Sequence, residues 1–132
     1  MATSTPGSGP STFRLGCTVL GTTDPRGLAA FYQQLLGYAV VDDQDDWVRL
    51  EPSGGGPGLA FQREQFHREP TWPGGPSDQQ MQLHLDIVVD DLGSATARAL
   101  EIGAREASYQ PEADCRVLID PAGHPFCLFE QF

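Results

Sequence analysis

The stretch Leu50-Glu51-Pro52-Ser53-Gly54 is matched near the other end of the chain by Ile119-Asp120-Pro121-Ala122-Gly123. In both, an aliphatic residue that closes an apolar run is followed by an acid, a proline, a small residue and a glycine. Proline and glycine in these positions are typical of a turn that follows a strand. The match indicates that the chain repeats one structural unit, and the elements around the two turns follow the same order.

The first unit begins with an apolar, β-branched run over 14–20, which is typical of a strand. Asp24 and Pro25 then supply an N-cap followed by proline at the first helical position, and Gly37 ends the helix that they start. Three short strand-like runs separated by turn residues complete the unit: 38–41, 47–50 and 58–62.

The second unit has a strand-like run over 82–89, a helix that Asp90-Asp91 caps and Gly103 ends, and three further strand-like runs over 105–108, 116–119 and 125–129. We therefore predict an α+β fold made of two tandem βαβββ modules. The predicted boundaries are a disordered tail over 1–12 and one domain over 13–130, with modules at about 14–62 and 81–130 and an inter-module loop over 63–80.

Composition excludes several classes of function. The chain has 132 residues, enough for one domain, and a formal net charge of −10. This charge repels phosphate backbones and anionic lipid heads, so we expect neither nucleic acid nor membrane as a partner. Three widely spaced cysteines do not indicate a disulfide framework, and no apolar run is long enough to span a bilayer. We expect a cytoplasmic protein.

Three segments carry a resemblance to a known family. They are the helix string over 24–37, the strand Leu83-His84-Leu85-Asp86-Ile87-Val88-Val89 with the Asp-Asp-Leu that follows, and the closing Asp120-Pro121-Ala122-Gly123-His124-Pro125-Phe126-Cys127-Leu128. Together they resemble the vicinal oxygen chelate superfamily, whose members include glyoxalases, bleomycin-resistance proteins and dioxygenases, and within it an actinobacterial glyoxalase-like subgroup. The resemblance implies that the modules curl into a cupped, mostly antiparallel sheet that encloses a small molecule, and that the chain forms a homodimer.

The resemblance also implies where a metal would bind. Metal-dependent members place ligands on the first, fourth, fifth and eighth strands, and matching the motifs puts Cys17, His84 and Cys127 at three of these positions. The fourth strand offers Leu59, Phe61 or Gln62, between which the sequence does not decide. A zinc site of Cys17, His84 and Cys127 is one interpretation. The other is that the cysteines are small apolar residues and that no metal or other cofactor is bound, which we favour because the oxygen ligands suited to hard metals are missing.

Without a metal, His84 is the residue best suited to proton transfer near neutral pH, and it is the predicted catalytic residue if the protein is an enzyme. Asp86 lies two residues further, on the same face of a regular strand, where it would orient His84 if the two side chains met. His124 lies in a turn, where we expect a structural role. The aromatic residues of the inter-module loop, Trp72 among them, are predicted to cover a pocket, to fasten the loop or to form a dimer interface.

Two functions follow from these residues. The first is a metal-independent protein that holds an apolar or aromatic metabolite in the cup, against the side chains of Trp47, Phe61, Trp72, His84 and Cys127. The alternative is an enzyme of the lyase or isomerase type that uses His84, with or without a divalent metal such as zinc. The resemblance does not choose between them, because one fold hosts many functions.

Overall fold

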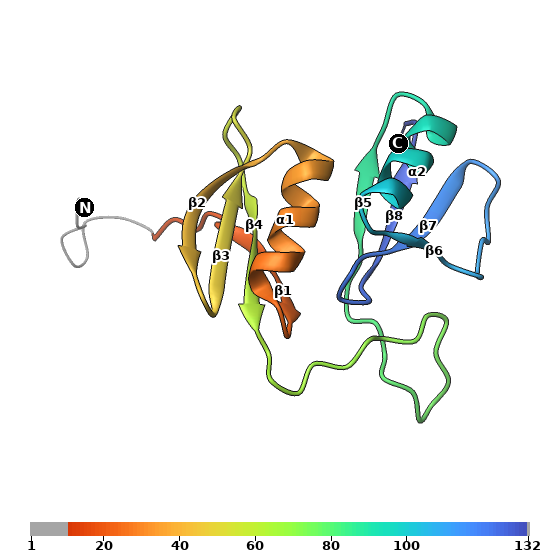
Figure 1. Ribbon diagram of the computed structural model, residues 1–132, viewed down its shortest axis with the longest axis horizontal. Coiled ribbons are helices and arrows are strands. Elements are labelled where there is room, and N and C mark those ends of the chain that lie inside the picture. Colours follow the sequence, from red (N-terminus) through yellow and green to blue (C-terminus); the bar gives the residue numbers. More distant parts are fainter. Residues whose placement is uncertain (1–10, 132) are drawn as a thin grey trace.

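The computed structural model describes residues 11–131 and places the first module in one mixed sheet with one helix (Figure 1). Its elements are β1 (Cys17–Thr22), α1 (Pro25–Leu36), β2 (Ala39–Gln44), β3 (Trp47–Glu51) and β4 (Gly58–Arg63). The strand order is β1-β4-β3-β2, with β1 parallel to β4 and the other neighbours antiparallel.

The second module has the same topology. It consists of β5 (Leu85–Val88), α2 (Leu92–Glu101), β6 (Arg105–Glu106), β7 (Cys115–Ile119) and β8 (Pro125–Phe129). The order β5-β8-β7-β6 repeats that of the first sheet, again with one parallel pair, β5 and β8. The predicted α+β fold of two βαβββ modules is therefore confirmed, as two four-stranded sheets.

Some strands are shorter than predicted. The runs over 82–89 and 105–108 shorten to β5 and β6, and the run over 14–20 shifts to β1, which ends two residues later, at Thr22. Each strand comprises the residues that have a partner on the neighbouring strand. His84 thus lies just before β5, because the ladder with β8 begins at the pair Leu85 and Phe126. The predicted tail over 1–12 falls almost wholly outside the described residues.

The helices form where their caps predict. The Asp24 side chain accepts a hydrogen bond from the Gly27 backbone N–H, Pro25 occupies the first turn, and Gly37 ends α1 in the left-handed conformation at φ 73°. In α2 the Asp91 carboxylate accepts from the Ser94 N–H in the same way. No helix in the described part of the chain is long and apolar enough to cross a membrane.

One hydrophobic core extends through both modules. In the first sheet, Val48 on β3 and Phe61 on β4 are register partners that point toward α1, and the ring of Tyr32 on α1 stacks on Phe61. The other side of α1 faces the second module, where Phe31 makes an edge contact with Phe126 on β8. Figure 1 shows α1 between the first sheet and the second module. Helix α1 therefore contacts both sheets and belongs to the core that they share.

A buried hydrogen bond strengthens this junction. The Tyr32 hydroxyl donates to Oδ2 of Asp120 at 2.7 Å, and both side chains are almost completely buried. Oδ1 of the same carboxylate accepts from the backbone N–H groups of Ala122 and His124 at 2.9 and 3.0 Å, so the carboxylate also holds the turn between β7 and β8. The turn between β7 and β8, whose sequence indicates the repeat, is thus the turn to which α1 is hydrogen-bonded.

Two histidines add bonds at the same place. The Nε2–H of His124 donates to the Gly21 carbonyl of β1 at 2.7 Å, and the Nε2–H of His67 donates to the Ala122 carbonyl at 2.8 Å. Both acceptors are carbonyl oxygens, so each imidazole must carry its proton on Nε2. His124 therefore has the structural role that its position in a turn predicts.

Replacing Tyr32 with Phe removes one donor from the buried Asp120 carboxylate. We expect Tyr32→Phe to lower the free energy of unfolding by about 1–3 kcal/mol, the cost of a buried polar group that loses its partner. The measurement is urea unfolding at neutral pH. Tyr38→Phe is the matched control, because the Tyr38 hydroxyl has no hydrogen bond within the described residues; its effect should stay below about 0.5 kcal/mol. Equal losses in the two variants would contradict the role given to Tyr32.

The same pair predicts a dependence of stability on alkaline pH. Burial, the charge of Asp120 and the hydrogen bond to it raise the pKa of Tyr32 well above its ordinary value. Above about pH 10 the unfolded chain loses this phenolic proton while the folded chain keeps it. The folded state then binds more protons than the unfolded state, so stability falls as pH rises, by up to about 1.4 kcal/mol per pH unit. Urea unfolding at alkaline pH should show a smaller fall in Tyr32→Phe than in the unmodified protein.

Candidate functional site

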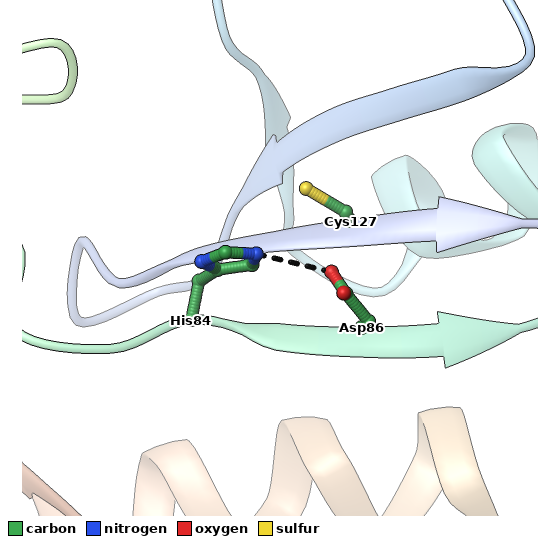
Figure 2. A group of neighbouring side chains, drawn as sticks. All are labelled: His84, Asp86 and Cys127. Carbon is green, nitrogen blue, oxygen red and sulfur yellow. Dashed lines mark ion pairs between the residues drawn. The ribbon is translucent and has the colours of Figure 1, made fainter.

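A group of three polar side chains lies on the second sheet, on the face opposite the core. Nε2 of His84 lies 3.1 Å from Oδ1 of Asp86, and the two residues with Cys127 present one nitrogen, one oxygen and one sulfur atom within 4.8 Å of one another (Figure 2). The His84 and Asp86 side chains are 31% and 37% exposed, whereas Cys127 is buried. This group, His84, Asp86 and Cys127, is called the polar cluster below.

Strand pairing explains why these residues meet. Asp86 on β5 is the register partner of Cys127 on β8 in a parallel ladder, so their side chains point to the same face of the sheet. Their neighbours Leu85 and Phe126 alternate to the other face and enter the core. The sequence left open whether His84 and Asp86 touch; the structure shows that they do. His84 precedes the first paired residue of β5. Its backbone is therefore not held in the regular strand spacing that separates side chains two residues apart.

Aromatic side chains cover the cluster on one side. The Trp72 ring stacks on the His84 ring with centroids 5.2 Å apart and an interplanar angle of 21°. Tyr109 meets Trp72 edge to face at 5.6 Å and 72°. Trp72 comes from the loop between the modules and Tyr109 from the connection between β6 and β7, so two irregular segments converge on the cluster.

Local hydrogen bonds hold the loop that carries Trp72. The Thr71 N–H donates to the Gln79 carbonyl at 2.8 Å, and the Gly75 N–H donates to the Asp78 carboxylate at 2.8 Å. Earlier in the loop, Glu69 forms an ion pair with Arg105 of β6 at 3.3 Å. The loop is therefore fastened to the second module, and Trp72 keeps its place over His84.

Two buried thiols lie next to the carboxylate. Burial, the neighbouring Cys115 and the Asp86 carboxylate raise the pKa of Cys127 to about 12. Burial also raises the pKa of Cys115, and the charges of Glu112, Asp86 and Asp114 add to that rise. Both cysteines are free thiols in an apolar patch with Val117, which Trp72 and Phe129 contact.

A cavity opens beside Asp86, in the gap between the two sheets. Its volume is about 370 Å³, within the range of small-molecule pockets. Its lining is mostly apolar and comes from both modules: Thr18, Leu36, Tyr38, Pro57, Gly58, Leu59, Leu85, Asp86, Ile87 and Val88. A second cavity, of about 220 Å³, is lined by His67, Leu83 and residues of β1, among others. Of these two cavities, only the first is lined by a member of the polar cluster.

The structure does not bring all predicted site residues together. Phe61 lies in the core, fully buried under Tyr32, and so does not face the cluster. Trp47, half-buried on β3, alternates with the buried Val48 and thus lies on the outer face of the first sheet. Cys17, half-buried at the start of β1, is not part of the cluster.

The fourth-strand positions add no metal ligand next to the cluster. Leu59 and Phe61 are buried in the core, and the exposed Gln62 donates a hydrogen bond to Glu64. The residues that fit a metal ion are therefore those of the polar cluster, with imidazole, carboxylate and thiolate, all of which zinc accepts. Three such ligands leave one coordination position open, where zinc would act as a Lewis acid on a bound oxygen.

Two contributors to the site were missed in the sequence. Cys115 shares the thiol patch with Cys127, and Tyr109 contacts Trp72. The alternation of apolar residues along β7 would have placed Cys115 on the face of Val117, had that strand been extended by one residue. Tyr109 lies in a connection with no periodic pattern, and no signal in the sequence pointed to it.

Solved structures with the same fold support this architecture. A glyoxalase/bleomycin resistance protein/dioxygenase family enzyme from Burkholderia phytofirmans PsJN has a TM-score of 0.67 at 19% identity, over 88% of this chain and 97% of that chain. A mutant of the fosfomycin resistance protein FosX from Listeria monocytogenes, solved with manganese(II) and a dihydroxypropylphosphonic acid, has a TM-score of 0.67 at 15% identity, over 92% and 95% of the two chains. A glyoxalase-related enzyme from Fulvimarina pelagi has a TM-score of 0.64 at 18% identity, over 87% and 86%. At these identities the likeness concerns the fold.

Sequence comparison gives the family. No curated protein matches this chain. A family model described as the glyoxalase-like domain matches residues 17–129, which extend from the first residue of β1 to the last residue of β8. The two modules, their shared topology and this match agree, and the chain belongs to the glyoxalase-like domain family.

Proposed function

We propose that the protein binds a small apolar or aromatic molecule at the polar cluster, under Trp72 and beside the cavity that Asp86 lines. The observation that carries the proposal is the stacking of Trp72 on a His84 ring that is itself held by Asp86. The aromatic rings provide apolar area, and the His–Asp pair provides a small number of directed hydrogen-bonding groups, which is the usual composition of a small-molecule site.

The fold does not need this arrangement. The core lies on the other face of the second sheet, between Phe126, Leu128 and the two helices, and it contains neither His84 nor Asp86. A partly exposed ion pair adds little to stability, typically below about 1 kcal/mol. A pair that contributes little to folding, yet is fastened under an aromatic ring, is better explained by recognition of a ligand.

Binding without a metal agrees with the ligand positions. Of the strand positions that carry ligands in metal-dependent members, this chain keeps the usual histidine at His84, and Cys17 lies apart from the polar cluster. Nε2 of His84 lies 3.1 Å from Oδ1 of Asp86, and each side chain keeps a second polar atom for a ligand. We propose that the site binds its ligand in this form, without a metal.

The second candidate is an enzyme of the lyase or isomerase type, and the direct contact between His84 and Asp86 favours it. A carboxylate that accepts from one imidazole nitrogen fixes the tautomer and leaves the other nitrogen to take a proton from a substrate. In this version His84 is the general base and Asp86 the residue that orients it. A zinc ion held by the polar cluster would add Lewis acidity at the same place.

We also propose a homodimer that acts in the cytoplasm. Cys17, Val19 and Trp47 lie on the outer face of the first sheet, and none of them belongs to the polar cluster. Val19 on this face is 41% exposed. A second copy placed against this face would shelter these residues and bring Trp47 toward a ligand. Three free thiols suit a reducing compartment.

Elemental analysis separates the two versions of the site. We expect protein purified without a histidine tag to contain no stoichiometric divalent metal, and His84→Ala to give the same result. Near-stoichiometric zinc that disappears in His84→Ala and Cys127→Ser but stays in Cys17→Ser would overturn the metal-free proposal. Cys17→Ser is the matched control, because it changes a thiol that lies outside the polar cluster.

A thermal-shift screen of aromatic metabolites tests binding itself. A ligand at about a hundred times its Kd stabilises the folded state by about 2.7 kcal/mol and raises Tm. We expect this rise to be lost in Trp72→Ala and His84→Asn and retained in Phe66→Ala, which removes an aromatic ring of the same loop that is 85% exposed. A ligand whose effect survives in both Trp72→Ala and His84→Asn binds elsewhere and would contradict the site.

A further inference from the structure

The carboxylate of Asp86 is a negative charge whose neighbours in the cluster are neutral or weakly basic groups. Its Oδ1 lies 3.1 Å from Nε2 of His84, and it belongs to no ion pair with an arginine in the described part of the chain. Arg116 on β7 is paired with Glu106 at 3.8 Å. Asp86 therefore has no arginine partner among the described residues, and a cationic ligand could pair with it.

From this arrangement we infer that the ligand is an organic cation, an ammonium group joined to an apolar or aromatic body, and that Asp86 and the rings of Trp72 and Tyr109 receive the ammonium group. The inference rests on the proposed function, because it assigns the chemical class of the molecule bound there. It adds a requirement that the proposed function lacks, namely a positive charge on the ligand.

The aromatic rings suit a cation. One face of Trp72 lies on His84, which is paired with Asp86, and Tyr109, 39% exposed, meets Trp72 edge to face. Tryptophan and tyrosine faces attract alkylated ammonium groups. A neutral ligand would gain the stacking area but nothing from the charge.

Several carboxylates lie near the cluster. The charged groups that act on the Cys115 thiol are Glu112, Asp86 and Asp114, all of them carboxylates. The whole chain has a net charge of −10, so the field at long range is also negative. Such a field attracts cations and repels carboxylates and phosphonates. An anionic ligand would meet Asp86 without a compensating arginine.

The apolar part of the ligand has space beside the charge. The cavity of about 370 Å³ that Asp86 lines is otherwise mostly apolar, with Tyr38, Ile87 and Val88 among its walls. This cavity offers apolar area next to the strand that carries Asp86, where the apolar body of such a ligand could lie.

Three probes with one phenyl ring and different charges test the inference: benzyltrimethylammonium, benzyl alcohol and phenylphosphonate. Isothermal titration calorimetry on the intact protein should show that the cation binds at least about tenfold more tightly than the alcohol, and that the phosphonate gives no binding heat. Asp86→Asn should abolish the preference for the cation. Trp72→Leu, which changes no charge, should weaken binding of the cation more than that of the alcohol.

The matched control is Asp46→Asn, which makes the same change in net charge at an exposed turn of the first module. The preference for the cation should survive in it. Equal binding of the cation and the alcohol, tighter binding of the phosphonate, no binding of the cation, or an equal loss in Asp46→Asn and Asp86→Asn would each overturn the inference. Binding of the alcohol or the phosphonate that depends on Trp72 and His84 would leave the proposed function standing, so the two failures are distinguishable.

Discussion

The hydrogen bond between Tyr32 and Asp120 is the constraint on which the arrangement of the two modules depends. It joins α1 of the first module to the turn between β7 and β8 of the second, at a depth where neither group reaches water. Burial raises the pKa of both groups, which shows that the charged forms are costly there. Since an unpaired polar group at this depth would cost more than the bond contributes, this pairing disfavours other packings of the modules.

The position of Trp72 in the candidate site depends on this junction between the modules. The loop between the modules begins where His67 donates to the carbonyl of Ala122, in the same turn that Asp120 holds, and continues to the ion pair between Glu69 and Arg105. Trp72 lies a few residues further along this loop and reaches His84. A change at Tyr32 would therefore act on Trp72 through the turn and the loop, although the two side chains belong to different parts of the molecule.

The features that the sequence predicted correctly are local ones. Caps at Asp24 and Asp91 and the repeated turn depend on residues close in the chain, and they predicted the helices, the repeat and the order of the elements. The buried face of a strand is harder to predict, because alternation shows which residues share a face but not which face is buried. The sequence therefore predicts Phe61 as a pocket residue, whereas its place in the core depends on the stacking with Tyr32, a contact between elements. The pairing of His84 with Asp86 likewise depends on where the ladder with β8 begins.

The same reasoning explains why membership of the family does not give the function. The fold fixes the positions of His84 and Cys127, but the chemistry depends on what surrounds them, and here those neighbours are a carboxylate, a second thiol and two aromatic rings. A metal ion would use the imidazole, carboxylate and thiolate of the polar cluster, whose ligand atoms lie within 4.8 Å of one another, whereas a cationic ligand would use the carboxylate and the aromatic rings. One set of side chains thus suits two kinds of ligand, and the family's fold alone does not choose between them.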